Sequence, residues 1–339
     1  ASPPEQAAKS STLSDSEAYV LANRISWGAT PALVRHLQQT GYKKYLSEAL
    51  HPAPLAVLPP EVAAQSATIA ANRKPLPEVM QELEQRRRVI DAKTDPDERK
   101  AAQQALQVDL NRMARESATS HVLRALYSPS QVSEEMVWFW LNHFNVFQGK
   151  ANIRALVGDY EESAIRPNAL GKFRDLLGAV TKHPAMLRYL DNEQNTARRT
   201  NENLARELME LHTLGVDGGY TQHDVQELAR VLTGVGISRN PDMPGMRREL
   251  KNFYVRSGLF EFHPARHDFG TKELLGKPLN NKGLDELEEA LDRLASHPTT
   301  ARFISKKLAT WWLSDEPSKA LVNAITDEFL RSSGDIAKT

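Results

Sequence analysis

NENLARELMELHTLGVDGGYTQHDVQELARVLTG, residues 201–234, is the stretch that decides the fold. On a helical wheel of about 100° per residue, the segment from Glu202 to Leu214 gathers its apolar side chains into one stripe. That stripe consists of Leu204, Leu208 and Leu211, flanked by Ala205. A stripe of this kind is typical of an amphipathic helix that packs on a core. We therefore expect a mainly α-helical protein.

The residues that follow predict a tight connection to a second helix. Gly215 can adopt the left-handed conformation that ends a helix, and Gly218 and Gly219 can form the turn. Thr221 and Asp224 have the spacing of a capping box, in which the two residues hydrogen-bond each other's backbone. The second helix should bury Val225, Leu228, Val231 and Leu232.

Helix capping leaves three polar residues of this segment without an assigned role, namely Glu207, His212 and Asn203. The wheel places Glu207 and His212 on opposite edges of the stripe, about 140° apart. A zinc metalloprotease helix needs two histidines on one face, so that class does not fit. A calcium loop starting at Asp217 does not fit either, because Gly219 stands where an oxygen ligand is required.

Two further elements should stand out from a single helical body of residues 18–339. Residues 76–127 carry long helical patterns that break at Asp95-Pro96 with a helix-start signal, which predicts a projecting antiparallel helical hairpin. Its charge runs are typical of a solvated surface. The segments LFEF and KELLG predict a small β-hairpin near residues 258–277.

Composition excludes several classes of protein. Lys plus Arg and Asp plus Glu are both 43, so a nucleic-acid-binding surface is not expected. No apolar run is long enough for a transmembrane segment. The absence of cysteine from the sequence excludes disulfides and thiolate chemistry. Residues 1–17 look like a flexible mature N-terminus left after signal-peptide removal, which predicts a periplasmic or secreted protein; a trimmed N-terminus is the alternative. We also expect the natural chain to continue past Thr339.

Six segments together resemble the motifs of a bacterial family known only as domain of unknown function 1800. They are residues 201–234 and the stretches LANRISWGATP, VWFWLNHFNV, IRPNALGKFRDLLGAVTKHPAMLRYLDNEQN, HDFGTKELLG and LASHPTTARFISKKLATWW. The resemblance spans about residues 18–339, which is nearly the whole chain.

This resemblance implies export but no defined activity, metal or cofactor. Genes of the family often neighbour those of exported sulfatase-like proteins, which implies such a protein as a partner. Leu141 departs from the family pattern, in which a histidine is more usual at this position. If that position holds a metal ligand in relatives, its loss weakens the site here, although His143 remains.

The candidate catalytic residues are His143, Glu207, His212, His267 and Asp268. For His143 a hydrogen-bonded core position and a catalytic role both stay open. His267 and Asp268 suit a general base pair or metal ligands, and equally a turn in which Asp268 bonds the backbone before Gly270. Amides near a helix start can hold an anion or sugar hydroxyls. The candidate ligand-binding residues are Asn142, Asn192, Asn201, Asn203 and Lys272.

Two functions follow as hypotheses. The first is a non-enzymatic exported scaffold or assembly partner at the cell envelope. The alternative is an exported hydrolytic or metal-assisted enzyme that acts on an envelope or polysaccharide substrate, which requires the candidate catalytic side chains to meet in one place. The position of Glu207 beside a buried stripe also predicts an arginine partner. The arginines considered are Arg24, Arg154, Arg166 and Arg174.

Overall fold

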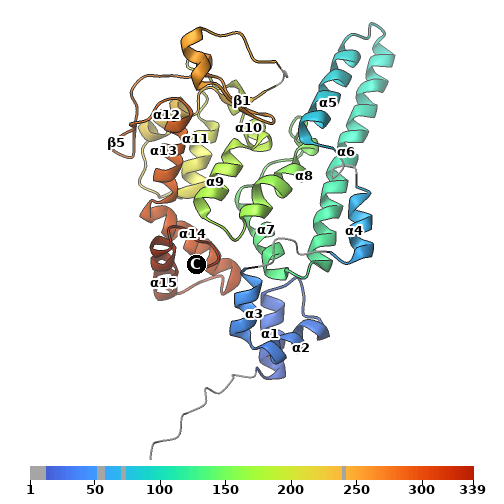
Figure 1. Ribbon diagram of the computed structural model, residues 1–339, viewed down its shortest axis with the longest axis vertical. Coiled ribbons are helices and arrows are strands. Elements are labelled where there is room, and N and C mark those ends of the chain that lie inside the picture. Colours follow the sequence, from blue (N-terminus) through green and yellow to red (C-terminus); the bar gives the residue numbers. More distant parts are fainter. Residues whose placement is uncertain (1–12, 52–57, 70–73, 239–241) are drawn as a thin grey trace, which may run out of the picture.

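The computed structural model describes residues 13–51, 58–69, 74–238 and 242–339. Figure 1 shows a helical body from which one long pair of helices extends. The predicted mainly α-helical fold is confirmed, since the strands form only two small sheets. No helix within the described ranges is long and apolar enough to cross a bilayer. Most of the expected flexible N-terminus, residues 1–12, lies outside the described residues.

The N-terminal helices form a small unit with a core of its own. They are α1 (Asp15–Arg24), α2 (Pro31–Thr40) and α3 (Tyr42–Ala49). The next helix, α4 (Pro60–Ala67), packs against residues of the long helix 96–127. Ser14 and Thr30 start the first two helices, because each side chain accepts a hydrogen bond from a backbone N–H three residues on. Ala18, Ala22 and Leu37 are fully buried and share a cluster with Val132 of the body.

The projecting hairpin consists of α5 (Leu76–Asp91) and α6 (Pro96–Tyr127). We call this pair the arm. Asp95 caps α6 by accepting hydrogen bonds from the backbone N–H groups of Asp97 and Glu98, so the break falls where the sequence predicts it. The two helices share a narrow apolar seam made of Leu83, Ile90, Leu106 and Leu110. The first half of α6 therefore buries its apolar face against α5, with Ala155 of the body at the edge of the seam.

The body is a layered set of short helices around one large core. Its elements are α7 (Gln131–His143), η2 (Ile153–Ala155), α8 (Val157–Asp159), η3 (Tyr160–Ile165), η4 (Arg166–Asn168), α9 (Phe173–Lys182), α10 (Pro184–Tyr189), η5 (Asn192–Gln194), α11 (Asn203–Glu207), η6 (Leu208–Thr213) and α12 (Gln222–Val231). Trp140 is fully buried, and its Nε1 donates a hydrogen bond to the Ala169 carbonyl. The aromatic residues of α7 thus anchor the core.

The last two helices of the C-terminal part close the lower side of the body (Figure 1). This part contains η7 (Arg248–Phe253), η8 (Pro264–Arg266), α13 (Leu284–Ala295), α14 (Pro298–Trp312) and α15 (Lys319–Arg331). Figure 1 shows α14 and α15 packed together below α13, with α7 on the other side of α14. This arrangement places one face of α14 opposite the end of α7.

The β structure differs from the single predicted hairpin. β3 (Phe260–Phe262) lies between β1 (Val235–Ile237) and β2 (Val255–Ser257), and all pairs are antiparallel. β4 (Glu273–Leu274) pairs with β5 (Lys277–Pro278) instead of with β3. The predicted pairing of LFEF with KELLG is therefore wrong. One partner of β3 is β1, which lies more than twenty residues earlier in the chain. Local strand patterns do not reveal a pairing over this separation.

The helix of residues 202–214 also departs from the wheel. α11 continues directly into η6, a π-helix in which hydrogen bonds span one residue more than in an α-helix; the Leu214 N–H, for example, donates to the Met209 carbonyl. This wider turn rotates the later side chains relative to a regular wheel. Leu211 is consequently 45% exposed, while Met209 and His212 are buried. The expected burial of Leu211 was wrong for this reason.

The second helix of this stretch matches its prediction. Val225, Leu228, Val231 and Leu232 are all fully buried. Thr221 and Asp224 form the capping box, and Gly215 has a left-handed φ of 87°.

Candidate functional site

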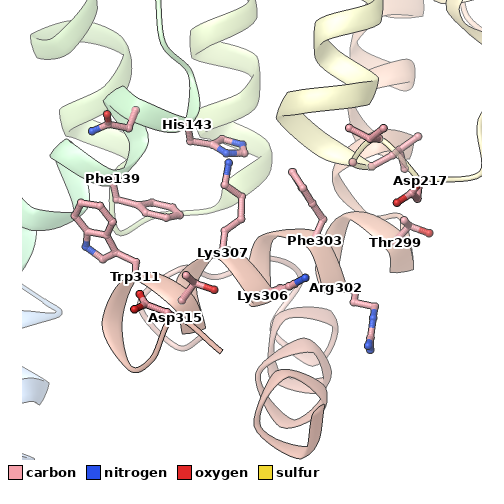
Figure 2. Close-up of a pocket in the computed structure, with 15 residues that line it drawn as sticks. Phe139, His143, Asp217, Thr299, Arg302, Phe303, Lys306, Lys307, Trp311 and Asp315 are labelled. Carbon is pink, nitrogen blue, oxygen red and sulfur yellow. The ribbon is translucent and has the colours of Figure 1, made fainter. Parts of the chain in front are cut away.

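A pocket of about 860 Å³ opens between the end of α7, the loop after η6 and one face of α14 (Figure 2). Its volume lies in the range of small-molecule sites. Of the candidates from the sequence it contains His143 and Asn142. The remaining lining residues are Phe139, Leu214, Gly215, Val216, Asp217, Thr299, Arg302, Phe303, Lys306, Lys307, Thr310, Trp311 and Asp315.

His143 occupies the inner wall of this pocket. It is only 7% exposed, and its Nε2 lies 3.1 Å from the backbone carbonyl of His212. A carbonyl can only accept, so Nε2 carries the proton and Nδ1 carries a lone pair in the neutral ring. Nδ1 is buried and has no hydrogen-bond partner in the described structure. The bond to His212 also satisfies a carbonyl in the last turn of η6, where intrahelical partners are lacking.

His143 and His212 are brought together, with ring centroids 6.1 Å apart. Burial lowers the pKa of His143 well below its ordinary value, and the nearby positive charge of Lys307 lowers it further. Burial and Lys307 also lower the pKa of His212 to about 3. Both imidazoles are therefore neutral at physiological pH, so they can accept a hydrogen bond but carry no charge.

Lys307 is the cation that faces these histidines. Figure 2 shows its side chain rising from α14 with the amine directed toward the His143 ring. The amine lies 5.3 Å from the centroid of the Phe303 ring, and burial lowers its pKa. No carboxylate pairs with Lys307 within residues 13–51, 58–69, 74–238 and 242–339. A half-buried ammonium without a counter-ion favours an anionic ligand.

His267, Asp268 and Lys272 lie in a different place, between α12 and α13. Nδ1 of His267 donates to the Thr233 carbonyl at 2.7 Å, and Lys272 donates to Glu286 Oε2 at 2.8 Å. Nε2 of His267 is 3.3 Å from the same carboxylate oxygen but is not aligned for a hydrogen bond. The side chains of His267 and Lys272 are fully buried, so this cluster joins elements rather than facing a pocket.

Asp268 is held by Arg230. Its two carboxylate oxygens accept from Arg230 Nε at 2.7 Å and from Nη2 at 3.3 Å. Asp268 Oδ1 also accepts from the Gly270 N–H at 2.8 Å. The hydrogen bonds from Arg230 lower the pKa of Asp268 to about 2. So acidic a carboxylate is a weak base, and its contacts match the turn interpretation.

Glu207 does not have the predicted arginine partner. Arg166 binds Glu134 and Glu161 instead, Arg174 binds Glu288 and Asp292, and Arg154 binds Gln107 and Asn111. Arg24 has no ion pair with Glu207 either, among the residues that the structure describes. Glu207 is only half-buried, so water can solvate the carboxylate and no counter-ion is required. The prediction was therefore wrong.

Three of the candidate asparagines, Asn142, Asn192 and Asn201, use their side chains in hydrogen bonds within the fold. Asn192 is fully buried and donates to the carbonyls of Leu232 and Val235. Asn201 accepts from the backbone N–H of Asn203, the first residue of α11. The exposed Asn142 donates to the Trp138 carbonyl one turn earlier in α7. Only Asn142 of these lines the pocket.

The structure thus separates the candidate residues into several places. No three His, Asp or Glu side chains come together as metal ligands in the described part of the chain. Sequence reasoning missed the residues of α14, above all Lys307, Phe303 and Trp311. Their signal was present in FISKKLATWW, where two adjacent lysines interrupt an apolar helix, but the helix wheel alone does not say that α7 lies opposite.

These observations define an α-helical protein with a projecting helical arm and a pocket in which a neutral histidine faces a half-buried lysine. The chain belongs to the family described as protein of unknown function DUF1800, whose model matches residues 20–339. The resemblance noted in the sequence is confirmed. No curated protein and no solved structure matches the chain.

Proposed function

We propose that this protein is a non-enzymatic scaffold at the bacterial cell envelope that holds an exported sulfatase-like protein against its arm. The partner and the periplasmic or secreted location come from the family resemblance. The scaffold role is supported by the distribution of the ionisable candidates, since Asp268, His267 and Lys272 bind other parts of the same chain and do not line the pocket of His143.

The observation that carries this proposal is a groove between the arm and the body. Its volume is about 1080 Å³, and it runs along α5 from Pro77 to Arg88 on one side. The opposite side is formed by Asn152, Arg188 and the sheet residues Ile237 and Arg256. Figure 1 shows α5 standing apart from the sheet, joined to the body through α6. Such a groove can receive a segment of a partner protein from the side.

The chemistry of the groove suits a polar, non-obligate interface. The α5 wall carries both charges, with the acidic residues Glu78, Glu82 and Glu84 in its first part and the basic residues Arg86, Arg87 and Arg88 after them. Met80 and Leu259 add partly buried apolar surface. Non-obligate protein–protein interfaces are about as apolar as the rest of the protein surface and have polar rims. A mixed wall of this kind selects a partner by charge complementarity.

A photo-cross-linking amino acid at Arg87, which is exposed in the groove, tests the scaffold. The same amino acid at Ala324, exposed on α15, is the matched control. We expect the sulfatase-like protein in native envelope extracts to cross-link to position 87 and not to position 324. Equal cross-linking at both positions, or none at position 87, contradicts the proposal. Cell fractionation tests the envelope location separately.

A hydrolytic or metal-assisted enzyme acting on an envelope or polysaccharide substrate is the second candidate. The observation that favours it is the unpartnered Nδ1 of His143 in an open pocket, because such an atom can accept a hydrogen bond from a bound substrate. Elemental analysis of the native protein and release of reducing sugar from envelope polysaccharide test it. Turnover that disappears in His143→Gln would favour the enzyme over the scaffold.

A further inference from the structure

The pocket of Figure 2 has an unused hydrogen-bond acceptor and an uncompensated cation at its inner end. The acceptor is Nδ1 of His143, in a side chain more than nine-tenths buried. The cation is the Lys307 amine, which points toward the same ring. Buried polar atoms without partners are rare in proteins, and each calls for an explanation such as a ligand. A group that satisfies both atoms must carry a donor next to a negative charge.

The walls of the pocket are aromatic. Phe139 and Trp311 meet edge to face with ring centroids 5.7 Å apart, and Phe303 lines the pocket from the other side of Lys307. Trp311 remains 36% exposed although it is a large aromatic residue. Exposed aromatic faces of this kind bind flat apolar surfaces, including the C–H faces of sugar rings.

The rim of the pocket is polar and carries both charges. Asn142, Thr299 and Thr310 supply neutral donors and acceptors, and the exposed charged residues are Asp217, Asp315, Arg302 and Lys306. Carboxylates accept hydrogen bonds from hydroxyl groups but repel a second anionic group. With Lys307 the lining has three cations and two carboxylates, so a ligand with one negative charge and several hydroxyls balances its charge.

We propose that this pocket binds a sugar that bears a carboxylate, such as a uronic acid. The carboxylate pairs with the Lys307 amine, and a neighbouring hydroxyl donates to Nδ1 of His143. The ring packs against Trp311, and the remaining hydroxyls meet the polar rim. This site goes beyond the scaffold role, because it lies at the other end of the body from the groove at α5.

Isothermal titration calorimetry with sodium glucuronate, and with glucose as the uncharged comparison, tests the proposal. We expect glucuronate to bind the full chain and glucose to bind at least about tenfold more weakly, because glucose lacks the charge-assisted bond to Lys307. Lys307→Met should reduce glucuronate binding to the level of glucose. Lys319→Met, an exposed lysine on α15 outside the pocket, should leave binding unchanged.

A second measurement reports on His143 without a substitution that risks misfolding. In the ¹⁵N-histidine-labelled protein, Nδ1 of His143 should give the signal of an unprotonated nitrogen. Glucuronate should shift that signal as the nitrogen accepts a hydrogen bond, and Lys307→Met should reduce the shift at the same ligand concentration. Failure of glucuronate to bind at millimolar concentration, equal binding of glucose, or an unmoved Nδ1 signal on binding would each overturn the proposal.

Discussion

The carboxylate of Glu207, at the end of α11, is half-buried and has no cationic partner in the described structure. Burial raises its pKa above the ordinary value of 4.5, and the like charge of Glu210 raises it further. A raised pKa in the folded state means that the protonated form is favoured. Stability from this group is present below pH 4.5 and is lost as the pH rises through the folded-state pKa.

Glu207→Gln should therefore be neutral or slightly stabilising at pH 7, by up to about 0.5 kcal/mol because the side chain is partly solvated. Its stability relative to the wild type should increase as the pH is raised from about 4 to 7. Urea unfolding at both pH values measures this. Glu202→Gln, at the N-cap of the same helix, loses the 2.9 Å ion pair with Arg206, so its effect on stability should have the opposite sign at pH 7. A clear loss of stability in Glu207→Gln would indicate a cationic partner after all.

Among the elements, the π-helix η6 and the turn after it control the pocket. η6 turns His212 inward and leaves its carbonyl free for His143. Gly215 follows with a left-handed φ, and a Cβ there would lie 2.9 Å from the Phe303 ring. Gly219 has a similar φ of 82°, but a Cβ there would meet nothing within 4 Å. Comparing alanine substitutions at these two glycines therefore distinguishes the cost of a left-handed backbone from the cost of a steric clash.

Gly219→Ala should cost roughly 1–2 kcal/mol, the penalty for a side chain in the left-handed region. Gly215→Ala should cost about 1–3 kcal/mol more, because the added methyl group must displace Phe303. Chemical denaturation of both variants compares these values. Equal losses would show that the Phe303 ring moves aside freely, and would argue against a rigid pocket wall.

At the scale of the whole molecule, a buried ionic network joins the arm to the body. Arg166 binds Glu134 of α7 at 2.6 Å and Glu161 of η3 at 2.5 Å. Glu161 in turn contacts His121 of α6 at 3.0 Å. The side chains of Glu134, Glu161 and Arg166 are at most 15% exposed. The surrounding carboxylates raise the pKa of Arg166, against the effect of its burial.

Arg166→Met should lower the free energy of unfolding by about 3–5 kcal/mol, because it leaves buried carboxylates without their counter-ion. It should also increase hydrogen exchange in the second half of α6, where the arm meets the body. Arg112 lies on α6 and forms ion pairs at the surface of the arm. Arg112→Met removes these pairs and should lower the free energy of unfolding by under about 1 kcal/mol. Similar losses in the two variants would mean that the network does not hold the arm.

Local features of the sequence were sufficient to predict much of the fold. The capping box of Thr221 and Asp224, the break at Asp95-Pro96 and the apolar stripe of α12 depend on neighbours within a few residues. Their hydrogen bonds and periodicity can therefore be recognised without the rest of the chain. The family was predictable for a similar reason, because its motifs are continuous segments.

Tertiary structure alone decided the rest. The π-helix that buries His212 and exposes Leu211 is a geometric adjustment that a regular wheel does not contain. The sequence around Arg166 does not identify its ion-pair partners. The packing of α7 against η3 places Glu134 and Glu161 beside it. The pocket depends on Lys307 meeting His143 across 164 positions of the chain. Long-range contacts of this kind follow from how helices pack, so residue patterns along one segment determine the helices but not the site between them.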